Sequence, residues 1–478
     1  MHFSQGRLQY QINSLSNQVV EGAELPFGEV LSGDRVEKVV HPADICCRKR
    51  LYTPAITILL WLFQAIHADK STAAAVRQFA AWLVRRGRAP CSPETRAYCE
   101  ARARLSLSAI QQLARETGRE VHEDAGHDWL WKGRPIKLVD GTTAIMPDTA
   151  ENQADYPQPD TQKPGLGFPI VRLVGVFCLA TGIMLELAMG RYKGKKQGEN
   201  SLARNLYDQF TPGDVMLADT YFCGYFDIAM LVQRGVDCVF RLHQCRKIDF
   251  RCGQRLGKGD HLVTWKKPAR PKWMDWDAYL ALPDALTLRE VRLRRRTKSG
   301  AGKRAKHRKK TAKKNRQLVI VTTLLDPQEV TKADLDRLYR ARWQVELDFR
   351  NLKTTLGMDR LRCKTPELVR KEIWIHMLAY NLVRSTMAKA AWQHALLPRE
   401  ISFKGACQTL LAFANQTCSR RLYQNVETQI LAIIAGSRVA DRPGRMEPRA
   451  VKRRPKEYPH LHLPRKILKA RLEKGLIL

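Results

Sequence analysis

The chain has 478 residues, which is enough for about three folding units of roughly 100 to 200 residues each. Apolar residues make up 44% and charged residues 27%, and this mix excludes a wholly disordered chain. The 82 Lys and Arg residues outnumber the 47 Asp and Glu residues, so that the net charge is +35. Such a surplus repels itself unless a polyanion neutralises it, so we expect nucleic acid as a partner.

The apolar segments are too short to cross a membrane, which requires about 20 consecutive apolar residues. Residues 56–66 form a short run, and the segment 173–190 is interrupted by Glu186 and by a Thr181-Gly182 turn signal. The first residues lack a charged region followed by an apolar one, so no secretory signal is expected. We therefore expect no membrane partner and a cytoplasmic, nucleoid-associated protein.

The 12 cysteines are dispersed along the chain, as is typical of thiols in a large cytosolic protein. One group invites a zinc hypothesis, but it has no paired Cys-x-x-Cys spacing and lies in a very basic stretch, so zinc is the weaker interpretation. The group consists of His243, Cys245, Cys252 and His261.

Residues 1–133 are expected to form an N-terminal helical DNA-binding region. Apolar periodicity predicts helices over 56–66 and 72–84, and Ser92 followed by Pro93 predicts the start of a third helix that runs to Leu113. The third helix carries Arg96, Arg102 and Arg104. It is either a solvated basic face or a helix that contacts DNA in the major groove, and the sequence leaves both open.

At Pro135 the pattern changes from helical to strand-like, so a new domain is expected there. Three early strands are followed by alternating helices and strands, which predicts an α/β fold with a mixed sheet flanked by helices. The expected strands cover 136–139, 144–146, a hairpin over 171–189, 215–218 and 236–242, and the expected helices cover 199–210 and 226–233.

The regular alternation then stops, and residues 244–317 look inserted. Their last part, from Arg289 to Arg316, is so rich in Lys and Arg that it is expected to be a basic arm for phosphate or a solvated linker. A strand over 318–325 resumes the sheet, and one long helix is expected over 331–356. Helices over 368–389 and 403–434 and a basic tail after Pro443 complete the chain.

Asp140 and Asp219 are expected where buried apolar strands open into turns, a place where α/β sheets present polar groups to ligands. Either residue alone could be a turn or capping residue. The long helix adds a stripe, because at about 100° per residue four polar side chains share a sector about 60° wide. The four are Tyr339, Arg342, Glu346 and Lys353. A surface salt-bridge ladder would explain the spacing, but these residue types around one Glu better suit an anionic ligand and a metal.

The spacing Tyr339-x₂-Arg342-x₃-Glu346-x₆-Lys353 resembles the YREK signature of bacterial insertion-sequence transposases that carry a DDE triad. Asp140 in Val-Asp-Gly-Thr is similar to the first aspartate of that family and Asp219 in Leu-Ala-Asp-Thr-Tyr to the second. The resemblance covers residues 135–390, and the inserted segment falls between the second aspartate and the glutamate, as in this branch.

The resemblance implies an RNase H-like catalytic domain over 134–243 and 318–395, a β-rich insertion with a basic arm over 244–317, and a helical C-terminal region over 396–478. It implies cut-and-paste transposition at terminal inverted repeats, with double-stranded DNA as transposon ends and target, and a homodimer in the synaptic complex. Asp140 would bridge two Mg²⁺ ions, for which Mn²⁺ can substitute, and Asp219 and Glu346 would each complete one metal site. Arg342 and Lys353 would hold phosphates, and Tyr339 would orient the same DNA backbone.

Some members of this family stack a flipped base on a tryptophan of the insertion, and Trp265, Trp273 and Trp276 are candidates, although core packing explains each equally well. Two other classes of function compete with a transposase. A structure-directed nuclease on the same fold would not explain the insertion or the signature spacing. A non-catalytic DNA-binding derivative is disfavoured because all three carboxylates are present.

Overall fold

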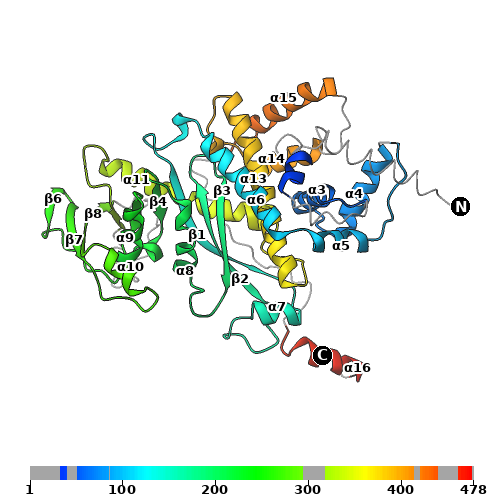
Figure 1. Cartoon of the computed structure of the whole chain (residues 1–478), viewed down its shortest axis with the longest axis horizontal. Coiled ribbons are helices and arrows are strands. Elements are labelled where there is room, and N and C mark those ends of the chain that lie inside the picture. Colours follow the sequence, from blue (N-terminus) through cyan, green and yellow to red (C-terminus); the bar gives the residue numbers. More distant parts are fainter. Residues whose placement is uncertain are drawn as a thin grey trace, which may run out of the picture.

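The computed structural model describes residues 33–39, 51–85, 87–293, 318–413, 420–439 and 461–475. Its centre is a nine-stranded sheet in the order β3-β2-β1-β4-β5-β9-β8-β7-β6 (Figure 1). The strands are β1 (Ile136–Ile145), β2 (Ile170–Cys178), β3 (Met184–Arg191), β4 (Val215–Ala218), β5 (Asp237–Arg241), β6 (Gln254–Gly257), β7 (Asp260–Lys266), β8 (Ala285–Leu293) and β9 (Leu318–Thr322).

The first five strands form the expected RNase H-like mixed sheet. β1, β2 and β3 pair antiparallel, whereas β4 and β5 run parallel to β1. The strands of the inserted segment do not form a separate sheet, because β8 pairs with β9 and β9 with β5. One continuous sheet therefore carries both the first five strands and the inserted strands, which lie at one end of the molecule (Figure 1).

The expected turn at residues 140–143 is wrong, because β1 is one continuous strand of ten residues. β2 pairs with it along its length, with Asp140 opposite Gly175 and Thr142 opposite Leu173. On its other side β1 pairs with β4 only as far as Leu138, opposite Leu217. Polar residues can follow Val139 without leaving the strand because one edge of β1 has no neighbouring strand beyond that point.

Alternate residues of the strands face two separate hydrophobic cores, as the two-residue period of a strand requires. Leu138, Leu217 and Val239 belong to the larger core, together with residues of the catalytic helices and of the N-terminal helices. Val139 and Met216 belong to the second core, which is covered by α8 (Glu199–Arg204) and α9 (Tyr225–Gln233). Both faces of the sheet are thus buried.

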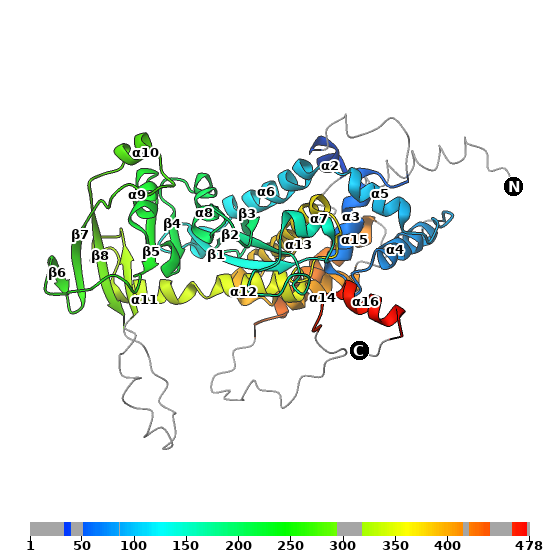
Figure 2. The same cartoon turned by 90° about the horizontal axis from the view of Figure 1, so that it is seen from below.

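The helix α13 (Pro366–Gln393) organises the larger core, since most of its 28 residues are buried. It packs against helices from both ends of the chain, so the N-terminal helices share one core with the sheet (Figure 2). Those partners are α3 (Pro54–Ile66), α6 (Leu107–Glu123), α14 (Phe403–Phe413) and α15 (Arg420–Gly436). The remaining helices are α2 (Gly33–Val39), α4 (Thr72–Arg85), α5 (Arg96–Arg104), α7 (Ala150–Asp155), α10 (Trp276–Ala281) and α16 (Arg465–Glu473).

The long helix expected over 331–356 is wrong in detail, because it is divided into α11 (Lys332–Ala341), α12 (Gln344–Arg350) and a π-helical turn, η5 (Asn351–Thr355). Between α11 and α12 the backbone hydrogen bonds join residues that are three positions apart instead of four. The Trp343 N–H donates to the Arg340 carbonyl at 3.3 Å, and the Glu346 N–H donates to the Trp343 carbonyl at 3.2 Å. This tighter turn rotates Glu346 relative to a regular helix. The helix expected from Ser92 to Leu113 is likewise divided, between α5 and α6.

A buried aspartate fixes α12 to the rest of the molecule. Asp348 is fully buried and accepts hydrogen bonds from Tyr380 Oη at 2.9 Å, from Arg384 at 2.6 Å and from Arg399 at 2.7 and 2.8 Å. Burying these three charged groups costs desolvation free energy. The hydrogen bonds between the carboxylate and the two guanidinium groups offset this cost only as long as all three groups are present. Asp348 therefore holds α12 against α13 and the segment after it.

None of the helices within the described ranges combines the length and the apolar character needed to cross a bilayer. The expected basic arm falls mainly on residues 294–317 and the start of the basic tail on 440–460, which lie outside the described residues.

We predict that Asp348→Ala lowers the free energy of unfolding by about 3 to 5 kcal/mol, because it leaves the buried guanidinium group of Arg384 and the partly buried one of Arg399 without their carboxylate. Urea unfolding followed by tryptophan fluorescence measures this. Asp336→Ala is the control, because the Asp336–Arg340 pair on α11 is largely exposed and should be worth less than about 1 kcal/mol. Equal losses in the two variants would contradict the role of Asp348.

Candidate active site

The structure brings Asp140 and Asp219 together at neighbouring positions of two parallel strands. Leu138 of β1 pairs with Leu217 of β4, and each aspartate follows two residues later. Because side chains two residues apart point to the same face, both carboxylates lie on the face of the larger core, just beyond the end of β4. The expectation that Asp219 follows a buried strand is met, since β4 is entirely buried and ends at Ala218.

Asp219 opens the short 3₁₀ turn η4 (Thr220–Phe222). Its Oδ1 accepts a hydrogen bond from the Tyr221 N–H at 2.7 Å, which leaves Oδ2 available. The Tyr221 carbonyl in turn accepts a hydrogen bond from Asn200 Nδ2 at 2.8 Å. The first turn of α8 is thereby attached to the segment that carries Asp219.

The third carboxylate, Glu346 of α12, reaches the aspartates through Arg342. One guanidinium nitrogen of Arg342 donates to Glu346 Oε1 at 2.7 Å, and another lies 3.5 Å from Asp140 Oδ2. Burial alone would lower the pKa of Arg342, but its hydrogen bond to Glu346 and its interactions with Tyr339 and Asp140 raise it. Arg342 is therefore a permanent cation between two of the three carboxylates.

Tyr339 and Lys353, the other two residues of the polar stripe, also lie next to the carboxylates. Burial and the nearby Asp219 raise the pKa of Tyr339 to about 12 although Arg342 and Arg241 lower it, so the phenol is neutral at physiological pH. Lys353 lies on the π-helical turn η5 and donates from Nζ to Thr142 Oγ1 of β1 at 3.2 Å. The structure thus places all six expected site residues around the middle of β1 and the end of β4.

Asp140 has a raised pKa of about 6, chiefly because burial disfavours its charged form. The Gly141 N–H, at 2.8 Å from Oδ1, and the Arg342 guanidinium lower the pKa, whereas the charges of Asp219 and Glu199 raise it. The site therefore holds more negative charge than its own cation balances, a condition that favours binding of a further cation.

The chemistry of these donors fits a hard divalent cation, since carboxylate oxygens are the ligands that Mg²⁺ and Mn²⁺ prefer. Within the described residues no three such side chains are gathered closely enough to hold an ion as they stand. The reason is visible in the geometry: Arg342 occupies the space between Asp140 and Glu346 and acts as a stand-in cation.

The three tryptophans of the inserted segment differ in their surroundings. Trp265 is buried and its indole N–H donates to Glu290 at 3.1 Å, so it is a packing residue. Trp273 and Trp276 are exposed, and an arginine lies over each ring, Arg204 at 3.7 Å and Arg270 at 4.7 Å. Two exposed aromatic residues that the sequence analysis did not select, Tyr221 and Trp343, lie closer to the carboxylates in the chain.

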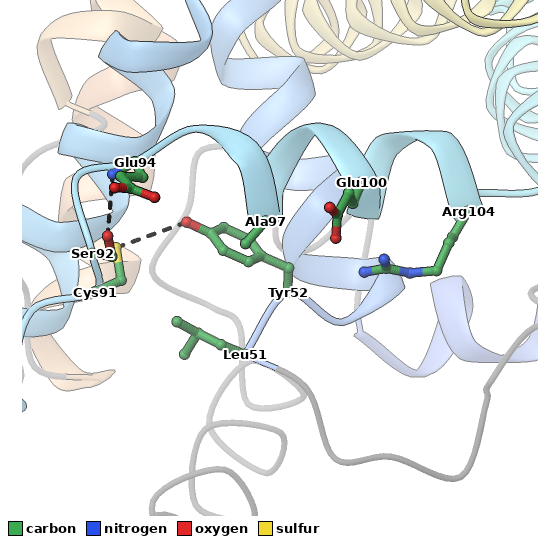
Figure 3. A pocket seen from close by; sticks show the side chains of 8 residues that line it. All are labelled: Leu51, Tyr52, Cys91, Ser92, Glu94, Ala97, Glu100 and Arg104. Atoms are coloured by element: carbon green, nitrogen blue, oxygen red, sulfur yellow. Dashed lines mark hydrogen bonds between the residues drawn. The ribbon is translucent and has the colours of Figure 1, made fainter.

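The arginines of the N-terminal helix α5 do not share one face. Arg96 is exposed and pairs with Glu100, whereas Arg102 is buried, stacks on Trp61 and donates to Cys363 Sγ at 2.8 Å. Arg104 lines an open hollow of about 380 Å³ (Figure 3). The expected basic face is therefore wrong for Arg102, because an arginine stacked in the core cannot contact DNA. The other lining residues of the hollow are Leu51, Tyr52, Cys91, Ser92, Glu94, Ala97 and Glu100.

The four residues of the zinc hypothesis are engaged differently. His261 is buried, with Nδ1 2.7 Å from the Cys252 carbonyl and Nε2 3.2 Å from Glu290 Oε2. The Cys245 N–H donates to His243 Nδ1 at 3.3 Å. The contacts of His261 are those of a packed core histidine.

The sequence analysis missed Glu199, which the structure places against Gly141 beside Asp140, and Asp348, which fixes α12. Glu199 follows a Gly-rich, Lys-rich turn at the start of a predicted helix, a position typical of an ordinary first-turn acid. Asp348 lies only two residues after Glu346, but its arginine partners are 36 and 51 residues away. No local pattern identifies such partners.

We predict that Asp140→Asn stabilises the metal-free protein at neutral pH. The pKa of Asp140 is raised, so the stability provided by its neutral form is present below about pH 4 and is lost as the pH rises through about 6. The asparagine avoids this cost, on the order of 1 to 3 kcal/mol. Thermal unfolding in EDTA measures it.

The variant should unfold at a higher temperature than the parent at pH 7.5 and show no such advantage at pH 4. Asp128→Asn, which changes an exposed carboxylate, is the control and should leave both curves unchanged. An Asp140→Asn variant that is less stable at pH 7.5 would show that Asp140 is a net stabilising charge.

Comparison with known proteins shows the family to which the chain belongs. A family model described as the transposase DDE domain matches residues 131–382. Transposase InsG for insertion sequence element IS4 of Escherichia coli (strain K12) is 29% identical over 378 residues, which cover 76% of this chain and 77% of the relative. Putative transposase InsL for insertion sequence element IS186A of the same organism is 40% identical over 65 residues, 14% of this chain and 18% of the relative.

Among solved structures, the piggyBac transposase synaptic complex with hairpin DNA aligns over 85% of both chains with a TM-score of 0.45 and 8% identity. The family model covers more than half of the chain and includes both aspartates, the glutamate and the segment that carries Arg342 and Lys353. The chain therefore belongs to the transposase DDE domain family and is a DDE transposase.

Proposed function

We propose that this transposase binds the terminal inverted repeats of an insertion sequence and moves the element by cut-and-paste transposition. Asp140, Asp219 and Glu346 are the catalytic carboxylates in this proposal. The observation that carries it is the meeting of the two aspartates, at matching positions of β1 and β4, with Arg342, which links Asp140 to Glu346.

Two Mg²⁺ ions, for which Mn²⁺ can substitute, would activate the attacking oxygen and stabilise the leaving oxygen of each phosphodiester exchange. Asp140, Asp219 and Glu346 are the residues that would hold these ions. Carboxylates that hold these ions need no covalent protein nucleophile, so water and the 3′ hydroxyl of DNA are the attacking groups. The half-buried position of Asp140 strengthens every charge interaction made there.

Arg342 has a double role in this proposal. It pairs with Glu346 and lies close to Asp140, and it would be free to contact the DNA if metal ions compensated these carboxylates. A guanidinium suits a phosphate group because its parallel N–H groups match two phosphate oxygens. Lys353, held by Thr142 beside β1, supplies a second phosphate contact, and the neutral phenol of Tyr339 supplies an uncharged donor to the same backbone.

The surface next to the carboxylates suits DNA with unpaired bases. Tyr221 is 63% exposed and lies two residues after Asp219, and Trp343 is 58% exposed and lies three residues before Glu346. Exposed aromatic rings beside a cleavage site offer stacking surfaces for bases. The net charge of +35 supplies the general attraction to the phosphate backbone.

In this proposal each of the regions expected from the sequence has its own function. Residues 1–133 would bind the element ends, 134–243 and 318–395 would catalyse, 244–317 would contact DNA through the basic arm, and 396–478 would form the helical C-terminal region. A homodimer would bring two catalytic sites to two ends and to target DNA. The protein would act in the cytoplasm, at the nucleoid.

The decisive experiment is an in vitro cleavage assay with Mg²⁺ on DNA that flanks the gene. We expect cuts at the ends of the element, and we expect Asp140→Asn, Asp219→Asn and Glu346→Gln each to lower the rate by roughly three orders of magnitude or more. DNA affinity in a gel-shift assay should stay within about threefold, because the carboxylates do not bind phosphate.

Glu329→Gln, which changes an exposed glutamate before α11, is the control and should cleave as the parent does. Unimpaired cleavage by Glu346→Gln would remove α12 from the active site. Binding by the parent without any cleavage would favour a non-catalytic DNA-binding derivative, and cuts only at branched DNA would favour a structure-directed nuclease.

A second prediction concerns Lys353. Replacing it with Ala should weaken binding of the element ends and reduce the slope of log affinity against log salt concentration by about one, because one phosphate contact is lost. Lys353→Arg keeps the charge and should retain most of that slope. If Lys353→Ala leaves the slope unchanged, Lys353 does not contact phosphate.

A further inference from the structure

The carboxylate of Glu199 lies against β1 beside Asp140. A Cβ atom built on Gly141 would lie 2.6 Å from Glu199 Cδ and 2.9 Å from Oε1, so the carboxyl group of Glu199 occupies the space that any other residue at position 141 would need. Glu199 is the first residue of α8, and it approaches β1 from the face opposite to Arg342. Gly141 is thus a local requirement for the position of Glu199.

Glu199 lies near both of the segments that carry the aspartates. Next to it in the chain, Asn200 donates to the carbonyl of Tyr221, whose N–H is bonded to Asp219. Glu199 therefore lies beside β1 at Gly141 and belongs to a turn that is tied to the Asp219 segment. Because β4 ends at Ala218, the edge of β1 has no strand there to separate Glu199 from the aspartates.

The Glu199 carboxylate has no hydrogen bond or ion pair to any of the residues that the structure describes. That is unexpected in a chain with a net charge of +35 and next to a turn with Lys193, Lys195 and Lys196. A half-buried carboxylate close to Asp140 is unfavourable by itself. Its position is explained if a cation compensates it in the working enzyme.

We propose that Glu199 is a fourth carboxylate of the catalytic site and donates an oxygen, directly or through a water molecule, to the divalent cation held by Asp140 and Asp219. The proposal rests on the assignment of those two aspartates under the proposed function. Mg²⁺ takes six oxygen ligands and keeps several waters, so an additional carboxylate can bind at either distance. A residue in this position raises metal affinity in the absence of DNA.

The test is binding of Mn²⁺ to the full-length protein without DNA, measured by electron paramagnetic resonance of the free ion. Glu199→Gln keeps the shape of the side chain and should weaken binding roughly tenfold or more. Gly141→Ala should also weaken Mn²⁺ binding, because its methyl group displaces the Glu199 carboxylate. This variant removes no carboxylate from the chain. The variant that carries both changes should lose no more Mn²⁺ affinity than Glu199→Gln alone.

Glu151→Gln is the matched control, because Glu151 is also a first-turn glutamate of a six-residue helix but is exposed. It should bind Mn²⁺ as the parent does. Unchanged affinity in Glu199→Gln, or an equal loss in Glu151→Gln, would overturn the proposal. So would a double variant whose loss is the sum of the two single losses, since Gly141→Ala would then act by another route.

Asp140→Asn and Asp219→Asn separate this inference from the proposed function. If both lose Mn²⁺ binding and Glu199→Gln does not, the role of Glu199 is wrong and the metal site stands. If neither loses it, the metal assignment itself is wrong, and the Glu199 proposal fails with it.

Discussion

The central constraint on this fold is the mutual repulsion of carboxylates that have to lie close together in a half-buried place. Burial and the charges of Asp219 and Glu199 raise the pKa of Asp140, and each of these effects opposes the charged state that a metal ligand needs. Arg342 offsets part of that cost by joining Asp140 to Glu346. The guanidinium group of Arg342 thus occupies a place that is suited to a metal ion. The rest of the protein fixes the positions of the three carboxylates around it.

The pairing of the strands and the buried cluster around Asp348 fix the positions of these carboxylates. The pairing of Leu138 with Leu217 aligns the two aspartates, and the early end of β4 opens the strand edge beside them. Asp348 holds α12 through Tyr380, Arg384 and Arg399, so that Glu346 is oriented by contacts two residues away from it. The aspartates are therefore set by backbone pairing and the glutamate by side-chain packing.

Much of this arrangement could be predicted from the sequence because it depends on local patterns. Apolar periodicity identified the strand that precedes Asp219, and spacing along a helix identified Arg342, Glu346 and Lys353. The continuous strand through Asp140 could not be predicted, since Gly141 and two threonines resemble a turn until a partner strand pairs with them. The tight turn before Glu346 and the buried Arg102 depend likewise on tertiary contacts that a helical wheel omits.

The Asp348 cluster also determines when, during synthesis, the enzyme is complete. Asp140 and Asp219 can take their places once β1, β2 and β4 are made, but Glu346 is oriented only when Arg384 and Arg399 have left the ribosome. At roughly 5 to 20 residues per second, the 180 residues between Asp219 and Arg399 take on the order of ten seconds or more to make. Throughout that interval the nascent chain has both aspartates and no fixed glutamate. A nascent chain that ends before Arg399 therefore lacks one of the contacts that hold Asp348, and with it α12 and Glu346, in place.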